Sequence, residues 1–253
     1  MLNKFSLEGK VAIVTGSSRG LGQGMAKGLA EAGADIVGVD YTNESNKTKE
    51  IIEGLGRKYL HLQADLMSID KLDFIVEESV KTFGHIDILV NNAGIIRRED
   101  AINFTEKDWD DVMDINVKTV FFFSQAVAKQ FMKQGTGGNI VNIASMLSFQ
   151  GGIRVPSYTA SKSGVMGITR LMANEWAKDS INVNAIAPGY MATDNTTALR
   201  ADEKRNAEIL GRIPANRWGG PEDLSGPVVF LASDAASYVN GYTLAVDGGW
   251  LAR

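Results

Sequence analysis

The sequence predicts an α/β fold, a doubly wound parallel sheet of about seven strands with helices on both faces, formed as a single domain over residues 1–253. Short β-branched runs alternate with longer amphipathic stretches, which is typical of repeating strand-helix units. Several of these runs are apolar on both faces, as strands covered by helices on each side should be. No linker, repeat or low-complexity tract divides the chain, so one large core is expected.

Each expected element follows from this alternation. The strands cover residues 11–15, 35–40, 58–63, 87–91, 139–144, 181–187 and 243–247. The helices cover residues 20–32, 44–55, 68–83, 106–134, 157–178 and 222–233. Gly33 and Gly84 follow two of these helices and Pro221 opens the last, as helix-end signals commonly do. Residues 190–218 are polar and weakly periodic, so we expect a lid or substrate loop there.

Composition narrows the class of protein. Hydrophobic residues make up 44% and charged residues 22%, and no apolar run approaches the roughly eighteen residues of a membrane span. The N-terminal residues lack the apolar region of a secretory signal, so a cytoplasmic location is expected. With no cysteine and two histidines, disulfides, thiolate catalysis and a histidine-based metal site are not expected. A net charge of −4 with scattered basic residues argues against nucleic acid, so a small molecule is the expected partner.

A glycine-rich turn follows the first strand and reads Thr15-Gly16-Ser17-Ser18-Arg19-Gly20-Leu21-Gly22. Glycines let the backbone approach a pyrophosphate closely, while the N–H groups of the following helix face the anion. A tight turn without any ligand has the same pattern, so the loop needs support from other features. With that support it predicts a Rossmann-type dinucleotide site that includes Gly16, Ser17, Arg19, Gly20, Leu21 and Gly22.

The acidic residue at the end of the second strand supplies such support. Asp40 lies where a carboxylate accepts hydrogen bonds from an adenosine ribose. A carboxylate there also repels the 2′-phosphate of NADP, which favours NAD. Arg19 argues for NADP, because its guanidinium could pair with that phosphate. We therefore expect NAD as the cofactor, with NADP as the alternative.

A phenol and an ammonium are placed for acid-base chemistry. Tyr158 and Lys162 are four residues apart, on one face of an expected helix. At about 4 Å and an effective dielectric near 20, the lysine charge would favour the phenolate by about 4 kcal/mol, or roughly three pKa units. Taken alone, such a pair is more often an ordinary surface pair.

Five motifs in order identify the chain as similar to the short-chain dehydrogenase/reductase family. They are the TGxxxGxG loop at 15–22, NNAG at 91–94, Ser145 placed 13 residues before the tyrosine, YxxxK at 158–162, and PG at 188–189. The resemblance covers about residues 8 to 250. It implies an oxidoreductase that interconverts a secondary alcohol and a ketone with a nicotinamide cofactor.

The resemblance also implies roles for individual residues. Tyr158 would be the general acid/base, Lys162 would lower its pKa and bond the nicotinamide ribose, and Ser145 would hold the substrate oxygen. Asn116 would anchor a water that relays protons through Lys162. Further cofactor contacts would come from Asp65 and Leu66 at the adenine, Asn92, Ala93 and Gly94 at its ribose, and Pro188, Gly189 and Thr193 at the nicotinamide.

Arginines suggest the substrate class. Arg154 lies in the segment between the catalytic serine and tyrosine, so it is expected to bind substrate together with Ser145 and Tyr158. Further arginines occur after NNAG, at Arg97 and Arg98, and in the expected lid, at Arg205, Arg212 and Arg217. Several guanidinium groups around one pocket suit a carboxylate, which favours a sugar acid. Each arginine taken singly is better explained as a solubilising surface residue.

Three alternatives stay open. A 3-oxoacyl carrier-protein reductase would share the catalytic set but should prefer NADPH, against which Asp40 argues. A gluconate or polyol dehydrogenase is the second. A catalytically silent NAD(H)-sensing module is the third, although it would have little need of the complete Ser-Tyr-Lys-Asn set.

An apolar run predicts association. Phe121, Phe122 and Phe123 together present more apolar surface than one helix face can bury against its own sheet. Members of the family usually pair this helix and the Tyr-Lys helix across two-fold axes. A homotetramer is therefore expected, with an aromatic cluster buried inside one subunit as the alternative.

Overall fold

The chain forms a seven-stranded sheet in which every neighbouring pair of strands is parallel. The computed structural model describes residues 2–43 and 46–253. The strand order is β3-β2-β1-β4-β5-β6-β7, so the chain starts near the middle, extends to one edge and then crosses back past β1. The strands are β1 Val11–Thr15, β2 Asp35–Asp40, β3 Tyr59–Gln63, β4 Ile88–Asn91, β5 Gly138–Ile143, β6 Ile181–Pro188 and β7 Thr243–Val246. The predicted doubly wound sheet is confirmed.

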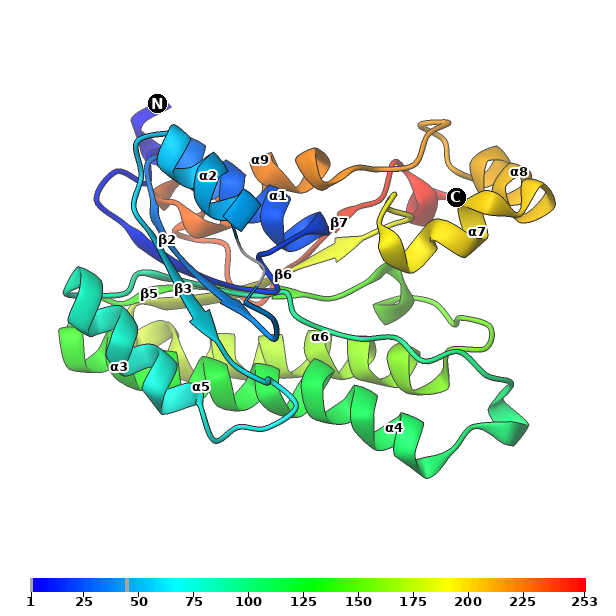
Figure 1. The fold of residues 1–253 in the computed structure, drawn as a ribbon, viewed down its shortest axis with the longest axis horizontal. Helices are drawn as coiled ribbons and strands as arrows, with labels where there is room; N and C mark the ends of the chain where they lie inside the picture. The colour runs from blue at the N-terminus through cyan, green and yellow to red at the C-terminus, as the bar shows by residue number, and fades with distance from the viewer. Residues whose placement is uncertain (1, 44–45) are drawn as a thin grey trace.

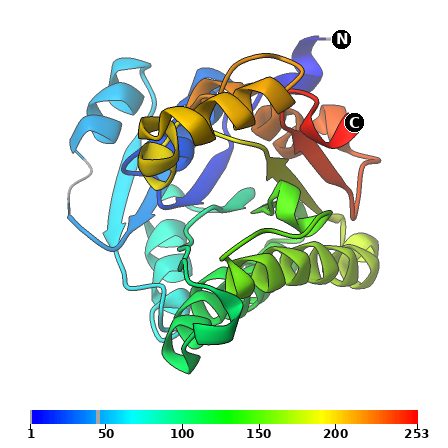
Figure 2. The same cartoon turned by 90° about the vertical axis from the view of Figure 1, so that its right-hand side faces the viewer.

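Helices cover both faces of this sheet (Figures 1 and 2). α1, α2 and α9 lie on one face, and α3, α5 and α6 lie on the other. In the described part of the chain the helices are α1 Gly20–Glu31, α2 Asn46–Gly54, α3 Leu72–Phe83, α4 Glu106–Met113, α5 Thr119–Gln134, α6 Pro156–Trp176, α7 Thr197–Ala201, α8 Glu203–Arg212 and α9 Ser225–Ala232. The order of strands and helices on two faces matches the α/β prediction.

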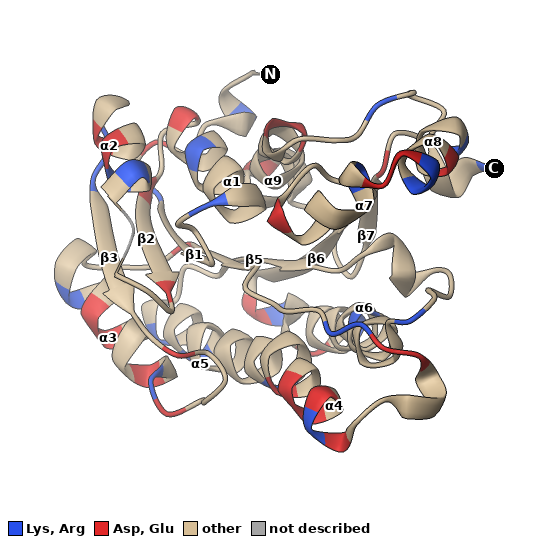
Figure 3. Ribbon diagram, turned by 45° about the vertical axis from the view of Figure 1, so that its right-hand side comes forward, with Lys and Arg blue, Asp and Glu red and all other residues tan. Residues whose placement is uncertain are grey.

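Two apolar layers hold the sheet between the helices. Along β1, Ala12 and Val14 pack into the layer under α1, while Val11 and Ile13 pack into the layer that contains Phe123 and Phe131 of α5. Strands buried on both faces need apolar residues at consecutive positions, which explains the runs in the sequence. Charged residues accordingly lie mostly on helices and loops (Figure 3). Within the described residues, no helix is both long and apolar enough to cross a membrane.

Several helix boundaries differ from the prediction. The expected helix over 68–83 begins only at Leu72, because the side chains of Asp65 and Ser68 accept hydrogen bonds from backbone amides two residues ahead and hold the chain in turns. The helix expected over 44–55 is α2 from Asn46, and its first two expected residues lie outside the described residues. The helix expected from 222 begins as a short 3-10 turn before α9.

The expected helix over 106–134 is interrupted. α4 and α5 are joined by one turn of π-helix, Asp114–Lys118, which contains the buried Asn116. A π-helical turn carries an extra residue, and such turns often occur at functional sites. A regular helical period cannot reveal it, so the prediction of one continuous helix was wrong at this point.

The segment 190–218 is not an irregular loop. It contains α7 and α8, which lie beyond the carboxyl end of β6 together with the C-terminus, at the right of Figure 1. Ile209 and Ile213 bury their side chains beside Trp250, and this small cluster attaches the segment to the end of the chain. The expectation of a loop was wrong, because α7 and α8 are short and α8 is mostly polar, so neither gave a clear periodic signal. The role of the segment as a lid or substrate loop stays a prediction.

Candidate active site

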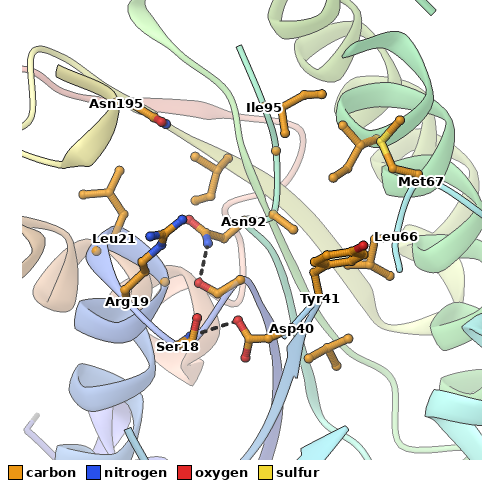
Figure 4. A pocket seen from close by; sticks show the side chains of 18 of the residues that line it. Ser18, Arg19, Leu21, Asp40, Tyr41, Leu66, Met67, Asn92, Ile95 and Asn195 are labelled. Atoms are coloured by element: carbon orange, nitrogen blue, oxygen red, sulfur yellow. Dashed lines mark hydrogen bonds between the residues drawn. The ribbon is translucent and has the colours of Figure 1, made fainter. Parts of the chain in front are cut away.

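One large cavity lies at the carboxyl ends of the strands, where open α/β sheets bind ligands. Its volume is about 880 Å³. Residues from the glycine loop, from the ends of β2, β3 and β4, from α6 and from the start of the 190–218 segment line it. Figure 4 shows these side chains converging from separate elements on one space. The glycine loop and the Tyr-Lys pair therefore share a cavity, as the motifs predict.

The glycine loop is packed against the β4 end without room for side chains. Gly16 has φ +66°, in the left-handed region, and a Cβ on it would lie 2.9 Å from Nδ2 of Asn92. A Cβ on Gly22 would collide with the carbonyl oxygen of Gly16. Both positions therefore require glycine. The N-terminus of α1 follows directly, so its backbone N–H groups are available to an anion.

Asn92 and Thr15 hold this loop in place. The Asn92 side chain donates to the carbonyl oxygens of Thr15 (2.8 Å) and Gly16 (3.2 Å). In return the Thr15 hydroxyl accepts from the backbone N–H groups of Asn92 (2.9 Å) and Ala93 (2.8 Å). Figure 4 shows Asn92 beneath the cavity with one of these contacts. The asparagine is thus a support of the glycine turn as well as a lining residue.

Asp40 is fixed at the other end of the cavity. Its carboxylate accepts hydrogen bonds from the Ser17 hydroxyl (2.8 Å) and the Ser18 backbone N–H (2.9 Å), and only 4% of the residue is exposed. Figure 4 shows the Asp40 side chain beside Ser18. Ser17 itself is fully buried and its hydroxyl bonds Asp40, so that side chain does not reach the cavity. A fixed negative charge therefore stands at the lip of the cavity.

Two arginines tie the 190–218 segment across the cavity. Arg19 of the glycine loop forms an ion pair with Asp194 at 3.2 Å, and both side chains are largely exposed. On the opposite side Arg98 donates to the carbonyl oxygen of Asn195 at 3.2 Å. Exposed pairs of this kind contribute little stability, so the segment can part from the glycine loop at low cost.

The Tyr-Lys pair is closer to the core than the sequence suggests. Lys162 is buried, with 5% of the residue exposed. Its ammonium group donates a hydrogen bond to the carbonyl oxygen of Ile143 at 2.6 Å and lies 5.5 Å from the centroid of the Tyr158 ring. Burial lowers the pKa of Lys162 from 10.5 to about 8. Burial also raises the pKa of Tyr158, against a side-chain hydrogen bond with Ser145 and the positive charge of Arg98, which both lower it.

The prediction that the charge of Lys162 lowers the pKa of Tyr158 well below its ordinary value is therefore wrong, because burial raises that pKa. The assumed separation of about 4 Å in a dielectric near 20 left out the removal of water from both groups, and desolvation penalises a phenolate as well as an ammonium.

Ser145 directly precedes a 3-10 turn at the end of β5. Its hydroxyl accepts from the backbone N–H of Leu147 at 3.2 Å, which fixes the side chain. The residue is buried and its side chain bonds Tyr158. Serine and tyrosine hydroxyls therefore lie side by side, which is the arrangement needed to hold one substrate oxygen between them.

Asn116 is buried in the π-helical turn and tied on two sides. Its Oδ1 accepts from the Ile95 N–H at 2.9 Å, while its Nδ2 donates to the Ile95 carbonyl at 3.0 Å and to the Ser161 hydroxyl at 3.1 Å. These contacts engage both polar atoms of the side chain. Through them Asn116 connects the loop after β4 to α6, the helix that carries Tyr158. Asn116 does not line the cavity.

Most predicted arginines are already paired with neighbours. Arg154 lies 3.0 Å from Asp100 and 3.6 Å from Glu99, and it is not among the cavity-lining residues. In the expected lid, Arg205 pairs with Glu208, Arg217 pairs with Asp223, and Arg212 stacks on Trp250. Arg97 lines the cavity but is held by Asp108 and Asp111. The guanidinium groups thus do not converge on one point.

The structure brings most of the predicted cofactor residues together. The predicted residues that line the cavity are Gly16, Arg19, Gly20, Leu21, Gly22, Asp40, Asp65, Leu66, Asn92, Ala93, Gly94, Tyr158, Lys162 and Thr193. Pro188 is the last residue of β6 and Gly189 follows it, and neither lines the cavity. Sequence reasoning missed Ser18, Val39, Tyr41, Thr42, Ala64, Met67, Ile95, Lys107, Asp111, Ile115, Ile143, Asp194 and Asn195. Most of them lie within two residues of a strand end or a motif residue, so the carboxyl edge of the sheet could have indicated them. Lys107, Asp111 and Ile115 come from α4 and the π-helical turn, and no sequence signal pointed to them.

The residues present fit a nicotinamide dinucleotide. The cavity runs from Asp40 and Asp65, past the glycine loop, to Tyr158 and Lys162. The glycine positions at its centre leave the backbone open to a diphosphate, and a polar rim at one end suits an adenosine ribose.

Comparison with known proteins agrees with this geometry. The family model described as Enoyl-(Acyl carrier protein) reductase matches residues 16–251. The chain is 71% identical over 253 residues to a 2-dehydro-3-deoxy-D-gluconate 5-dehydrogenase of Escherichia coli (strain K12) and 69% identical to the protein of that name in Dickeya dadantii (strain 3937), with 100% of each chain covered in both cases.

Solved structures are similar over nearly the full length. An Agrobacterium tumefaciens protein given the provisional name 2-deoxy-D-gluconate 3-dehydrogenase, with bound NADP, is 56% identical with a TM-score of 0.91, covering 99% of this chain and 100% of its own. A gluconate 5-dehydrogenase of Burkholderia cenocepacia, in complex with NADP and tartrate, is 38% identical with a TM-score of 0.95, covering 100% and 99%. These likenesses extend to the whole catalytic fold.

Proposed function

Because the chain belongs to the short-chain dehydrogenase/reductase family, we propose that it is a 2-dehydro-3-deoxy-D-gluconate 5-dehydrogenase acting as one catalytic domain over residues 1–253. It would transfer a hydride between a nicotinamide cofactor and a secondary alcohol or ketone of a keto-deoxy sugar acid. The observation that carries the chemistry is that Tyr158 and Lys162 line the cavity that the glycine loop enters, while Ser145, outside that lining, is hydrogen-bonded to Tyr158. The substrate class is supported by the names of the relatives.

The residues of this chain would divide the work as follows. When bound, the nicotinamide supplies the hydride to the carbonyl carbon in reduction and accepts it in oxidation. Tyr158 gives its hydroxyl proton to the carbonyl oxygen as the C=O double bond becomes C–OH, and takes it back in the reverse direction. Ser145 donates a hydrogen bond to the same oxygen while negative charge develops on it. Lys162, held by the Ile143 carbonyl, keeps a positive charge near the phenol.

The predicted site residues keep their roles within this proposal. Asp65 and Leu66 would meet the adenine, and Asn92 to Gly94 its ribose, which their place in the cavity lining supports. Thr193, which lines the cavity, would lie at the nicotinamide end, and Pro188, the last residue of β6, and Gly189 after it would lead the chain to that end. Asn116 would anchor the proton-relay water through its backbone carbonyl, since its side chain is fully engaged and the π-helical turn alters the helical hydrogen bonding there.

A substrate panel with two variants tests the proposal. Tyr158→Phe should reduce turnover at least about a thousandfold, since the proton donor is gone, while NADH still binds in a fluorescence titration. Tyr242→Phe, an exposed tyrosine at 59%, serves as the matched control and should leave both unchanged. Wild-type protein should reduce keto-deoxy sugar acids in preference to 3-oxoacyl thioesters and neutral polyol ketones. Preference for a thioester would support the acyl carrier-protein reductase alternative, and NADH binding without any turnover would support the sensing module.

We propose that NAD(H) is preferred over NADP(H). The support is the fixed Asp40 carboxylate, whose charge opposes a 2′-phosphate. Two features argue for NADP instead, namely the NADP in the two solved relatives and an exposed Arg19 that could leave Asp194 for the phosphate. We expect kcat/KM for NADH to exceed that for NADPH by at least about tenfold, which is roughly 1.4 kcal/mol. Equal or reversed use would mean that Arg19 outweighs Asp40.

We propose a homotetramer. Support comes from exposed apolar side chains on the helices of one face, which are Trp109 of α4, Phe122 and Met132 of α5, and Leu171 of α6. Phe123 is fully buried within the subunit, whereas Phe122 is 37% exposed. The apolar surface that the sequence predicts to be exposed is therefore only partly present, because Phe122 is exposed and Phe123 is not. Sedimentation should give four subunits, and a monomer at micromolar concentration would refute the proposal.

For the biological setting we propose the cytoplasm, where nicotinamide cofactors are recycled, and the breakdown of uronate polymers such as pectin. The support is chemical, because elimination reactions on uronates give keto-deoxy sugar acids of the class named for the relatives. Growth of a deletion strain on galacturonate polymers and on glucose would test this setting. Equal growth on both would contradict it.

A further inference from the structure

A histidine stands behind the fixed carboxylate of the cavity. His61 of β3 is paired in register with Gly38 of β2, and Asp40 follows two residues later on that strand, so His61 and Asp40 project from the same face of the sheet. Nε2 of His61 lies 3.8 Å from Oδ2 of Asp40. This nitrogen is buried and has no hydrogen-bond partner among the described residues. Buried polar atoms are nearly always paired, so the exception calls for an explanation.

The other groups on this side of the sheet carry no buried charge. The glycine loop and α2 contribute the buried hydroxyls of Ser17 and Thr48. Tyr59, two residues before His61 on β3, adds a phenol 3.4 Å from the Ser17 hydroxyl. The charged residues of α2 in its described part are all exposed, and they are Lys47, Lys49, Glu50 and Glu53. Within the described residues, Asp40 is therefore the one charged group at ion-pair distance from His61.

The charge of His61 decides the net charge at this end of the cavity. Histidine is the side chain whose ordinary pKa places its change of charge between about pH 5 and 8. Because 13% of the His61 side chain is exposed, its ring can exchange a proton with solvent. With a neutral ring, Asp40 presents its full negative charge to a ligand. With a protonated ring 3.8 Å away, that charge is largely compensated.

We propose that His61 makes the choice between NAD(H) and NADP(H) depend on pH. Protonation of His61 compensates Asp40 and lowers the repulsion of a 2′-phosphate, so discrimination against NADP(H) weakens as the pH falls. This inference rests on the proposed function, since it needs a dinucleotide whose adenosine ribose lies at Asp40. It assigns a role in specificity to a residue that does not line the cavity.

Affinity for NAD(H) should change little with the charge of His61. The Ser17 hydroxyl and the Ser18 backbone N–H hold the Asp40 carboxylate at 2.8 and 2.9 Å, and neither of these donors titrates in this pH range. The carboxylate therefore keeps its position for the ribose hydroxyls in both states of the histidine. The effect should fall on the dinucleotide that carries the additional phosphate.

Calorimetric titration of the cofactor-free protein with NAD⁺ and NADP⁺ tests this at about pH 8 and about pH 6. The quantity compared is the ratio of the Kd for NADP⁺ to the Kd for NAD⁺. Between these pH values the ratio should fall about fivefold more in wild type than in His61→Gln. The 2′-phosphate itself gains a proton near pH 6, so part of the decrease is common to all variants. Only the part that His61→Gln removes belongs to the histidine.

Two further variants complete the comparison. His61→Asn is also neutral at every pH and should behave as His61→Gln does. His85→Gln removes the other histidine of the sequence, which is partly exposed beside Asp87 before the amino end of β4, far along the strand from the cavity. This control should keep the pH dependence of wild type.

Proton uptake gives a second readout that a merely structural role would not move. If protonated His61 favours NADP⁺, binding of NADP⁺ near pH 6.5 must take up more protons in wild type than in His61→Gln. Titrations in two buffers with different heats of ionisation measure this uptake. A histidine that only supports the packing of β3 would alter both affinities without altering the number of protons bound.

The outcomes separate this inference from the proposed function. An equal fall of the Kd ratio in wild type and in both neutral variants, or equal proton uptake, would refute the role of His61 and leave the dehydrogenase function intact. Wild-type protein that binds neither dinucleotide would refute the proposed function, and this inference with it. A pH effect that depends on His61 in a protein that reduces no sugar acid would support the inference and refute the proposed substrate.

Discussion

Replacing Lys162 by methionine should abolish turnover and stabilise the cofactor-free protein. Methionine fills a similar volume without the charge that the folded chain keeps out of water. Burial lowers the pKa of Lys162 from 10.5 to about 8, and this difference of about 2.5 units corresponds to roughly 3 kcal/mol of cost for the buried ammonium. The Ile143 carbonyl would lose its partner, at a cost of about 1–2 kcal/mol. The expected net gain is about 1–2 kcal/mol, or about 2–8 °C in Tm.

The pH dependence identifies the cause. Below a pH of about 8, the lysine is protonated in both the folded and the unfolded chain, so the whole burial cost is present. Between 8 and 10.5 the folded chain has released the proton while the unfolded chain still holds it, so the cost declines, and above 10.5 it is gone. The stability difference between Lys162→Met and wild type should therefore shrink by about 2 kcal/mol from about pH 7 to about pH 9.5.

Urea unfolding of both proteins at these two pH values is the assay. Lys27→Met, which replaces an exposed lysine of α1, should change stability little at either pH. A less stable Lys162→Met, or a difference that does not vary with pH, would refute the claim that an uncompensated buried charge is maintained for catalysis.

Three further changes test other parts of the site. Gly22→Ala should abolish NADH binding in a fluorescence titration, since its Cβ collides with the Gly16 carbonyl, whereas Gly167→Ala, in open space, should not. Asp40→Asn should lower the NADH-to-NADPH ratio of kcat/KM by about tenfold, and an unchanged ratio would show that the carboxylate does not discriminate. Alcohol oxidation should rise steadily above neutral pH while ketone reduction stays flat, because burial raises the pKa of Tyr158 and keeps it protonated. Equal pH profiles in both directions would contradict that assignment.

Much of the fold follows from the sequence because strands buried on both faces need continuous apolar runs. β1 and β2 have the predicted bounds, and β7 ends one residue before its predicted end. The helical regions were less predictable. The π-helical turn at Asp114–Lys118 adds a residue without changing the apolar pattern, and α8 buries mainly Ile209, too little for a clear periodic signal.

The motifs correctly predicted which side chains lie at the site, but they did not predict the burial and the charged neighbours of these side chains. The spacing of Tyr158 and Lys162 correctly places them in one cavity, but the direction of their pKa changes depends on how much water each group loses, which spacing does not encode. The partners of arginines are equally hidden. Arg154 and Arg98 look alike in the sequence, yet only the folded loops show that one meets Asp100 and the other a carbonyl.

The strand order has a consequence for how the chain reaches this state. Five of the six strand pairings join strands that are consecutive in the sequence. Only the pairing of β1 with β4 joins strands that are separated in the sequence by two others, β2 and β3. Parallel sheets form slowly when distant segments must meet, because chain entropy is lost before contacts compensate for it. A nascent chain could complete β1, β2 and β3 early and close β4 against β1 before the catalytic helix leaves the ribosome. Assembly of the phosphate-binding half would then precede that of the half that performs the chemistry.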